Sequence, residues 1–142
     1  MITSQEGINL IKQFEGYRSH AYQDSVGVWT IGYGHTIGVK SGDVITEVQA
    51  EAYLRSDLHK VENAINAVGL KMAQNQFDAL VSLFFNVGTG YLKNFIPLLR
   101  ADVNSLDIPA KIQKYVYAGG KVLQGLVNRR KAEAELYKKK SI

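Results

Sequence analysis

The run FEGYRSHAYQDSVGVWTIGYGHT, residues 14–36, is the segment from which the fold of this chain is predicted. It places Glu15, Asp24 and Thr30 within sixteen residues, at the predicted end of a helix, in a turn and at the start of a strand-like segment. Hydrolysis of a glycosidic bond needs a carboxylic acid that protonates the leaving oxygen and a second polar group on the opposite face of the sugar. The run contains candidates for both groups, although each residue taken alone also fits a structural role.

The segments around these residues predict a helix followed by a small β region. Apolar residues recur at helical spacing over residues 3–15, and T-x-x-E at Thr3 and Glu6 predicts a capping box at the start of this helix. Gly16 can end it. Residues 17–45 mix β-branched and aromatic residues with glycines, which predicts short strands joined by tight turns.

The remainder of the chain predicts helices. A second capping box, T-x-x-Q at Thr46 and Gln49, begins a long helical pattern that continues to about Val68. This helix separates a small mixed N-terminal part from a larger helical part. Further helices are predicted over residues 74–86, which are apolar on all sides and should be buried, and over 95–102, 107–118 and 126–138.

Composition limits the class of protein. A length of 142 residues is typical of one globular domain, and no apolar run is long enough to cross a bilayer. The N-terminus, MITSQEG, lacks the basic start and apolar stretch of a secretory signal. Cysteine is absent, which excludes disulfides, a thiolate nucleophile and cysteine metal sites. The net charge of +4 either favours an anionic partner or only aids solubility.

Three segments together resemble one known family. The first is Glu-x8-Asp-x5-Thr followed by I-G-Y-G-H-T, the second is FFNVGTG at residues 84–90, and the third is YAGGKVLQGLVNRRKAEAELY at 117–137. They are similar, in this order and over nearly the full length, to the phage-type lysozymes, the endolysin muramidases of tailed bacteriophages. The resemblance implies an α+β, mostly helical fold in one catalytic domain, residues 1–142. It would have a small β lobe at about 1–50, a connecting helix at about 47–68 and a helical lobe at about 69–142.

The resemblance also implies roles for individual residues. Glu15 matches the general acid, Asp24 the carboxylate that stabilises the cationic transition state, and Thr30 the hydroxyl that positions water. Thr36 and Phe85 match positions that border the sugar, although Phe85 also fits an ordinary core position. No cofactor and no metal are implied.

An arginine near the acid is a further feature of the family. Arg129 and Arg130 match its position, and Arg18 is a third candidate; the sequence leaves the choice open. Such a contact would orient Glu15 before substrate arrives, while opposing its protonation in the free enzyme.

No second histidine lies at metal-ligand spacing from His35, and the resemblance implies that His35 is structural. By resemblance its acidic partner is Asp57. The chain departs from the family pattern at Tyr115, where a tryptophan is usual, and around Pro97. Neither change touches Glu15, Asp24 or Thr30.

The implied activity is hydrolysis of the β-1,4 bond between N-acetylmuramic acid and N-acetylglucosamine in bacterial peptidoglycan. The expected partners are the wall and a separate holin, with a monomeric enzyme held in the host cytoplasm until release, and without nucleic-acid binding or stable membrane insertion. Three alternatives stay open. A non-catalytic wall-binding module predicts loss of Glu15 or Asp24, and a nucleic-acid-binding protein predicts steep salt dependence. A lytic transglycosylase would leave anhydro ends.

Overall fold

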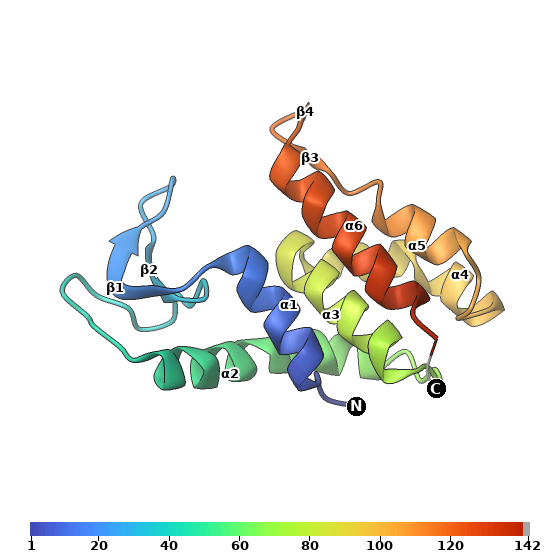
Figure 1. The fold of residues 1–142 in the computed structure, drawn as a ribbon, viewed down its shortest axis with the longest axis horizontal. Helices are drawn as coiled ribbons and strands as arrows, with labels where there is room; N and C mark the ends of the chain where they lie inside the picture. The colour runs from blue at the N-terminus through green and yellow to red at the C-terminus, as the bar shows by residue number, and fades with distance from the viewer. Residues whose placement is uncertain (141–142) are drawn as a thin grey trace.

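The computed structural model describes residues 1–140 and shows a small β lobe and a larger helical lobe connected by one long helix (Figure 1). The predicted α+β class, mostly helical, is confirmed. In chain order the elements are α1 (Gln5–Glu15), β1 (Arg18–Gln23), β2 (Trp29–Gly32), α2 (Glu47–Asn66), α3 (Gln74–Val87), the 3₁₀ helix η1 (Thr89–Asn94), α4 (Ile96–Ala101), α5 (Asp107–Ile112), β3 (Tyr117–Ala118), β4 (Lys121–Val122) and α6 (Gln124–Lys138).

The start of α1 differs from the prediction. Ser4 is the N-cap residue, and its hydroxyl accepts a hydrogen bond from the backbone N–H of Gly7. The predicted capping box of Thr3 and Glu6 is wrong because both side chains have distant partners: Thr3 donates to Glu62 on α2, and Glu6 pairs with Lys139. Tertiary contacts have replaced the local cap.

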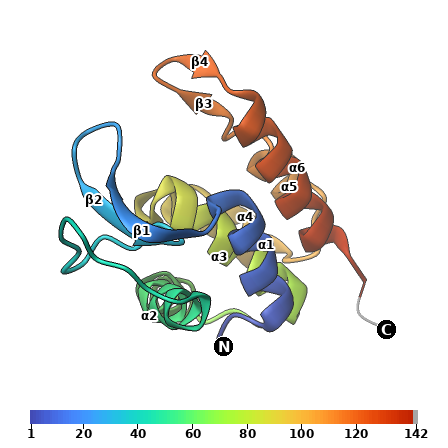
Figure 2. The ribbon, with the colours of Figure 1, turned by 60° about the vertical axis from the view of Figure 1, so that its left-hand side comes forward.

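The β lobe is built from two tight turns. Strands β1 and β2 pair antiparallel, with Tyr22 opposite Thr30, around a turn at residues 24–28 (Figure 2). At the end of β2 the backbones of Ile31 and His35 exchange two hydrogen bonds of 2.9 Å, which closes a second turn. That turn contains Gly34 at a φ of 81°, a backbone conformation that residues other than glycine rarely adopt. The second turn folds back toward α1.

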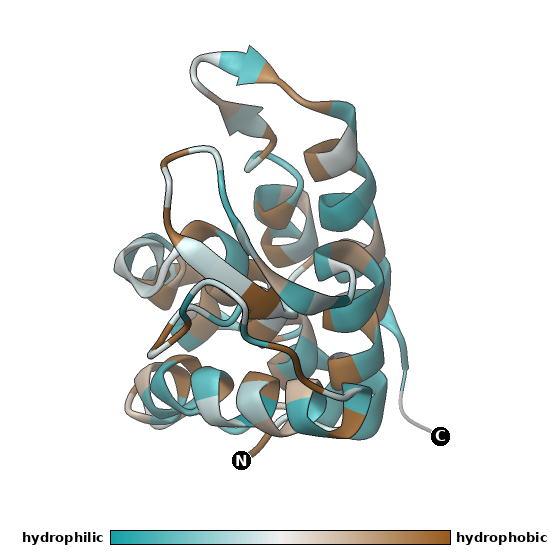
Figure 3. Cartoon of the chain, turned by 90° about the vertical axis from the view of Figure 1, so that its left-hand side faces the viewer, coloured by the Kyte–Doolittle hydropathy of each residue, from teal (hydrophilic) through white to brown (hydrophobic). Residues whose placement is uncertain are grey.

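Helix α2 begins as predicted. The backbone N–H of Gln49 donates to the Thr46 hydroxyl at 3.2 Å, and the N–H of Thr46 donates to the Gln49 side chain at 2.9 Å, so the capping box is confirmed. Apolar and polar positions alternate around this helix and its neighbours (Figure 3). The side chains that α2 buries recur at helical spacing: Ala50, Leu54, Leu58, Val61 and Ile65.

Helix α3 forms the centre of the helical lobe. Every residue from 76 to 84 is buried, as the all-round apolar pattern predicts. Helices α1, α2 and α6 all pack on it. The approach of α1 is close, since a Cβ on Gly7 would lie 2.7 Å from the side chain of Asp78. Core packing therefore holds α1, which carries Glu15, and α6, which carries Arg129 and Arg130, against one central helix.

The segment after α5 corrects the predicted helix over residues 107–118. Helix α5 ends at Ile112, and residues 117–122 form a short antiparallel hairpin. Its turn is Gly119-Gly120, both at positive φ. Two-residue hairpin turns favour residues that adopt positive φ, so this glycine pair reverses the chain rather than only interrupting a helix. Helix α6 then starts at Gln124.

The N-terminal segment is held by a buried carboxylate. The backbone N–H and the hydroxyl of Thr3 donate to Glu62 Oε2 at 2.7 and 2.6 Å, and His59 Nδ1 lies 3.0 Å from Oε1. Burial alone would raise the pKa of Glu62, but the hydrogen bonds from Thr3 and the contact with His59 outweigh it and lower the pKa. Glu62 therefore stabilises the fold in its ionised form.

We expect Glu62→Gln to lose about 1.5–3 kcal/mol of unfolding free energy at pH 7, the usual value of hydrogen bonds to a charged group. A depressed folded pKa contributes stability above the unfolded value of about 4.3, which is lost as pH falls through the folded value. The difference from the wild type should therefore shrink below about pH 4 in urea unfolding. Exposed Glu135→Gln is the control, and a difference independent of pH would contradict the role of the charge.

Candidate active site

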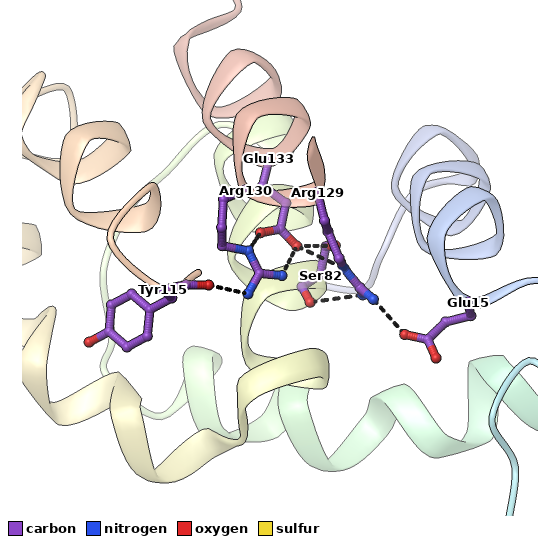
Figure 4. Close-up of polar contacts among 6 residues, drawn as sticks. All are labelled: Glu15, Ser82, Tyr115, Arg129, Arg130 and Glu133. Carbon is purple, nitrogen blue, oxygen red and sulfur yellow. Dashed lines mark hydrogen bonds and ion pairs between the residues drawn. The ribbon is translucent and has the colours of Figure 1, made fainter. Parts of the chain in front are cut away.

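Glu15 is the last residue of α1 and lies between α6 and the turn that follows β2. Its side chain is 20% exposed, and Oε2 accepts a hydrogen bond of 2.6 Å from Arg129 Nη1 (Figure 4). On the other side, a Cβ on Gly34 would lie 3.1 Å from Oε1. The I-G-Y-G-H segment therefore needs glycine at position 34 for two reasons, the backbone conformation and the nearness of the carboxylate.

Asp24 begins the turn between β1 and β2. Its Oδ1 accepts hydrogen bonds from the backbone N–H groups of Val26, at 3.0 Å, and Val28, at 2.8 Å. This arrangement is an Asx turn, the structural role that the residue type also predicts. The carboxylate is exposed and is held in one orientation by its own turn.

Thr30 is coupled to Asp24 through Val28. The Thr30 hydroxyl donates to the Val28 carbonyl at 3.0 Å, and the same carbonyl accepts from the backbone N–H of Asp24 at 2.9 Å. The Thr30 side chain is buried, and because its proton is engaged, its oxygen presents only lone pairs to a further partner. One peptide segment thus orients both side chains.

The three candidate arginines have different partners in the structure. Arg129 contacts Glu15, whereas Arg130 points to Glu133, with Nε 2.6 Å from Oε1, and to the Tyr115 carbonyl. Arg18 lies over the ring of Tyr22. Residues adjacent on a helix differ by about 100° in direction, so which of two neighbouring arginines meets a distant carboxylate depends on how the helix packs.

Behind Arg129 lies a buried group of charges that sequence reasoning missed. Glu133 Oε2 accepts from Ser82 Oγ at 2.5 Å, from Arg129 Nε at 3.3 Å and from Arg130 Nη2 at 3.1 Å (Figure 4). Burial raises the pKa of Glu133 and lowers that of Arg130, and their mutual attraction opposes both shifts. The spacing in the sequence could have predicted this group, because Glu133 follows Arg129 by four residues and Arg130 by three, and residues at these separations are neighbours on a helix.

The other expected residues lie around this centre. His35 Nδ1 is 2.8 Å from Asp57 Oδ2, and the His35 ring stacks on the Tyr53 ring with the centroids 4.4 Å apart. Thr36 is exposed after the second turn. Phe85 is half-buried and packs against the core. No group of three or more His, Asp and Glu side chains in residues 1–140 lies close enough together to hold a metal ion.

A hollow of about 410 Å³ lies between the end of α3, η1 and the β3–β4 hairpin. Tyr115 lines it and packs edge-on against Tyr91, with ring centroids 5.5 Å apart. Asn86 and Leu126 also line it, one helical turn from Ser82 and Arg130 respectively. Tyr115 thus forms part of an aromatic wall where the family usually has tryptophan, and Pro97 lies in the first turn of α4, outside this lining.

Comparison with known proteins identifies the family. Residues 12–133 match the family model described as phage lysozyme. The chain is 41% identical to an endolysin of Acyrthosiphon pisum secondary endosymbiont phage 1, over 96% of this chain and 98% of that protein. It is 44% identical to the endolysin of Lactococcus phage c2, over 98% of this chain but 61% of that protein.

A solved structure agrees with these relatives. A crystal structure of a P22 lysozyme mutant superimposes with a TM-score of 0.88, at 36% identity, over 96% of this chain and 98% of that one. Among residues 1–140, no helix combines the length and apolar character that a membrane span requires. The chain therefore belongs to the phage lysozyme family of peptidoglycan-hydrolysing enzymes.

Proposed function

We propose that this chain is a muramidase that cleaves the β-1,4 bond between N-acetylmuramic acid and N-acetylglucosamine during host lysis. The observation that carries this proposal is the arrangement of Glu15, which is held between Arg129 and the Gly34 turn at the edge of the hairpin lobe. That lobe presents Asp24 and Thr30 from one shared backbone segment. The set supplies an acid, a second carboxylate and a water-binding oxygen.

In this mechanism Glu15 is the general acid. Arg129 orients the Glu15 side chain, and a bound glycan excludes water and offers the glycosidic oxygen as a proton acceptor. Transfer of the proton from Glu15 to that oxygen breaks the bond to the anomeric carbon. The aglycone leaves as an alcohol, and positive charge develops on the sugar ring.

Asp24 and Thr30 act on the positively charged sugar that remains after the aglycone leaves. The negative charge of Asp24 stabilises the cationic sugar. Thr30 accepts a hydrogen bond from water, because its own proton is directed to the Val28 carbonyl. Attack of this water on the far face adds a hydroxyl to the anomeric carbon with inversion, and the water's second proton passes to Asp24 or to solvent.

The distribution of charge supports an acidic polymer as the substrate. Residues 69–142 carry twelve Lys and Arg against five Asp and Glu, whereas residues 1–68 carry five against eight. The positive charge thus belongs to the helical lobe, and such a field attracts a polyanion. We propose that the monomeric enzyme waits in the host cytoplasm and reaches the wall once a holin opens the membrane.

The decisive test is digestion of purified peptidoglycan with mass spectrometry of the released ends. Reducing muramic acid ends from the wild type, and none from Glu15→Gln, are expected. Anhydromuramic ends would instead indicate a lytic transglycosylase. Binding to the wall with no released fragments would indicate a non-catalytic module.

A second test uses the glycine beside the acid. In Gly34→Ala the new Cβ would lie 3.1 Å from Glu15 Oε1, and we expect about a 10–100-fold lower kcat because the carboxyl is displaced. Gly38→Ala is the matched control, since Gly38 also has positive φ but meets no atom within 4 Å. Both variants should lose similar unfolding free energy. Equal kcat in the two would contradict the placement of Glu15.

A further inference from the structure

We propose that Glu133 and Ser82 are positioning residues that act through Arg129. They fix the direction in which Arg129 meets Glu15, and Glu133 compensates part of the positive charge of Arg129. The inference rests on the proposed role of Glu15 and extends it into the buried side of the helical lobe. Neither residue reaches the reacting atoms. Their effect passes through one guanidinium group that they hold from behind.

Arg129 is held along its whole guanidinium group. Its Nε donates to Glu133 Oε2 at 3.3 Å, and its Nη2 donates to the Ser82 carbonyl at 3.2 Å. Because the guanidinium is planar and rigid, these two contacts determine the direction of the third nitrogen, Nη1. That nitrogen donates to Glu15 at 2.6 Å. Arg129 itself is 4% exposed, so water does not offer the group an alternative orientation.

The hydrogen-bond partners indicate that Glu133 is a carboxylate. Arginine nitrogens can only donate, so the contact of 3.4 Å between Arg129 Nη2 and Ser82 Oγ makes that oxygen an acceptor. The Ser82 proton is then directed to Glu133 Oε2. The other oxygen of Glu133 lies 2.6 Å from Arg130 Nε, so two guanidinium groups contact the same carboxyl, and their positive charges favour its ionised form. The nitrogen and oxygen of that ion pair have no hydrogen-bond partner with good geometry, so they rely on charge alone.

The four charged groups alternate in sign. The order is Glu15, Arg129, Glu133 and Arg130, contributed by α1 and α6. The other groups facing Glu133 are neutral: Ser82 on α3 packs against it, and Tyr115 presents its carbonyl to Arg130. Glu133 therefore compensates part of the Arg129 charge that Glu15 experiences. Without it, the field at Glu15 becomes more positive and disfavours the protonated acid.

The test is the pH profile of peptidoglycan hydrolysis by Glu133→Gln. Because the substitution removes a negative charge behind Arg129, we expect the alkaline limb of the profile to move to lower pH by on the order of one unit, which lowers the rate on that limb about tenfold. Glu133→Asp keeps the charge and should leave the limb in place while lowering kcat. Exposed Glu135→Gln, the same change in charge two residues away, should match the wild type.

A structural role alone would give another pattern. If Glu133 only supports the fold, Glu133→Gln lowers the active fraction equally at every pH and leaves the limb unmoved, which would overturn the proposal. If Glu133→Gln does not fold, Ser82→Ala serves instead, because it leaves no buried charge unpaired. Ser82→Ala removes the hydroxyl contacts to Glu133 and Arg129 but keeps the backbone carbonyl contact to Arg129, so we expect kcat to fall only a few-fold with KM unchanged. An unchanged kcat would overturn the proposal. Full activity of Glu15→Gln would instead overturn the proposed function itself.

Discussion

Glu15→Gln is expected to reduce the rate of peptidoglycan hydrolysis by about 10²–10⁴-fold, the usual contribution of a general acid. Glutamine retains the size of the side chain and an oxygen that can accept from Arg129 Nη1, so the local packing should survive. It has no acidic proton to transfer. We therefore expect kcat to fall while KM stays within a few-fold, because the loss occurs only in the transition state.

The control for this substitution lies on the same helix. Glu6→Gln makes the same change near the start of α1, where the side chain is 57% exposed and pairs with Lys139. It should hydrolyse peptidoglycan at the wild-type rate. Circular dichroism and urea unfolding of both variants distinguish lost chemistry from lost structure. A Glu15→Gln rate within twofold of the wild type would rule out Glu15 as the acid.

Arg130→Met is expected to cost about 3–5 kcal/mol of unfolding free energy, because it removes one partner of a buried ion pair. Arg130 and Glu133 are both 0% exposed, and the Glu133 carboxylate would keep only Arg129 and Ser82. Urea unfolding at pH 7 measures the loss. Arg100→Met, on the exposed side of α4, removes the same charge and should change the stability by less than about 0.5 kcal/mol.

A double substitution separates charge from packing in this group. Arg130→Met with Glu133→Leu removes both charges, and replacing a buried pair by apolar residues is often neutral or stabilising. The double variant should therefore recover most of the stability lost by Arg130→Met. In Arg130→Met alone the folded pKa of Glu133 is raised further, so its stability deficit should shrink as pH falls. A double variant as unstable as the single one would show that Arg130 acts through packing.

Several elements were predictable because their signals are local. The capping box of Thr46 and Gln49 involves residues three apart, and the buried face of α2 recurs at the helical period. The capping box of Thr3 and Glu6 is the instructive error. The same local pattern is present, but Glu62 and Lys139 offer those side chains other partners. Local propensity was overridden by contacts that exist only once the folded chain brings Thr3 beside Glu62 of α2 and Glu6 beside Lys139.

The sequence by itself predicted the fold class and the family and singled out Glu15, Asp24 and Thr30 as candidate catalytic residues, because the spacing and glycines of three short segments carry that information. Only the tertiary structure decided which arginine meets the acid and which residues support it. Glu15 and Arg129 are 114 positions apart, and Ser82 and Glu133 are 51 apart. Contacts at such separations depend on the rotation and crossing of packed helices, which no short pattern encodes.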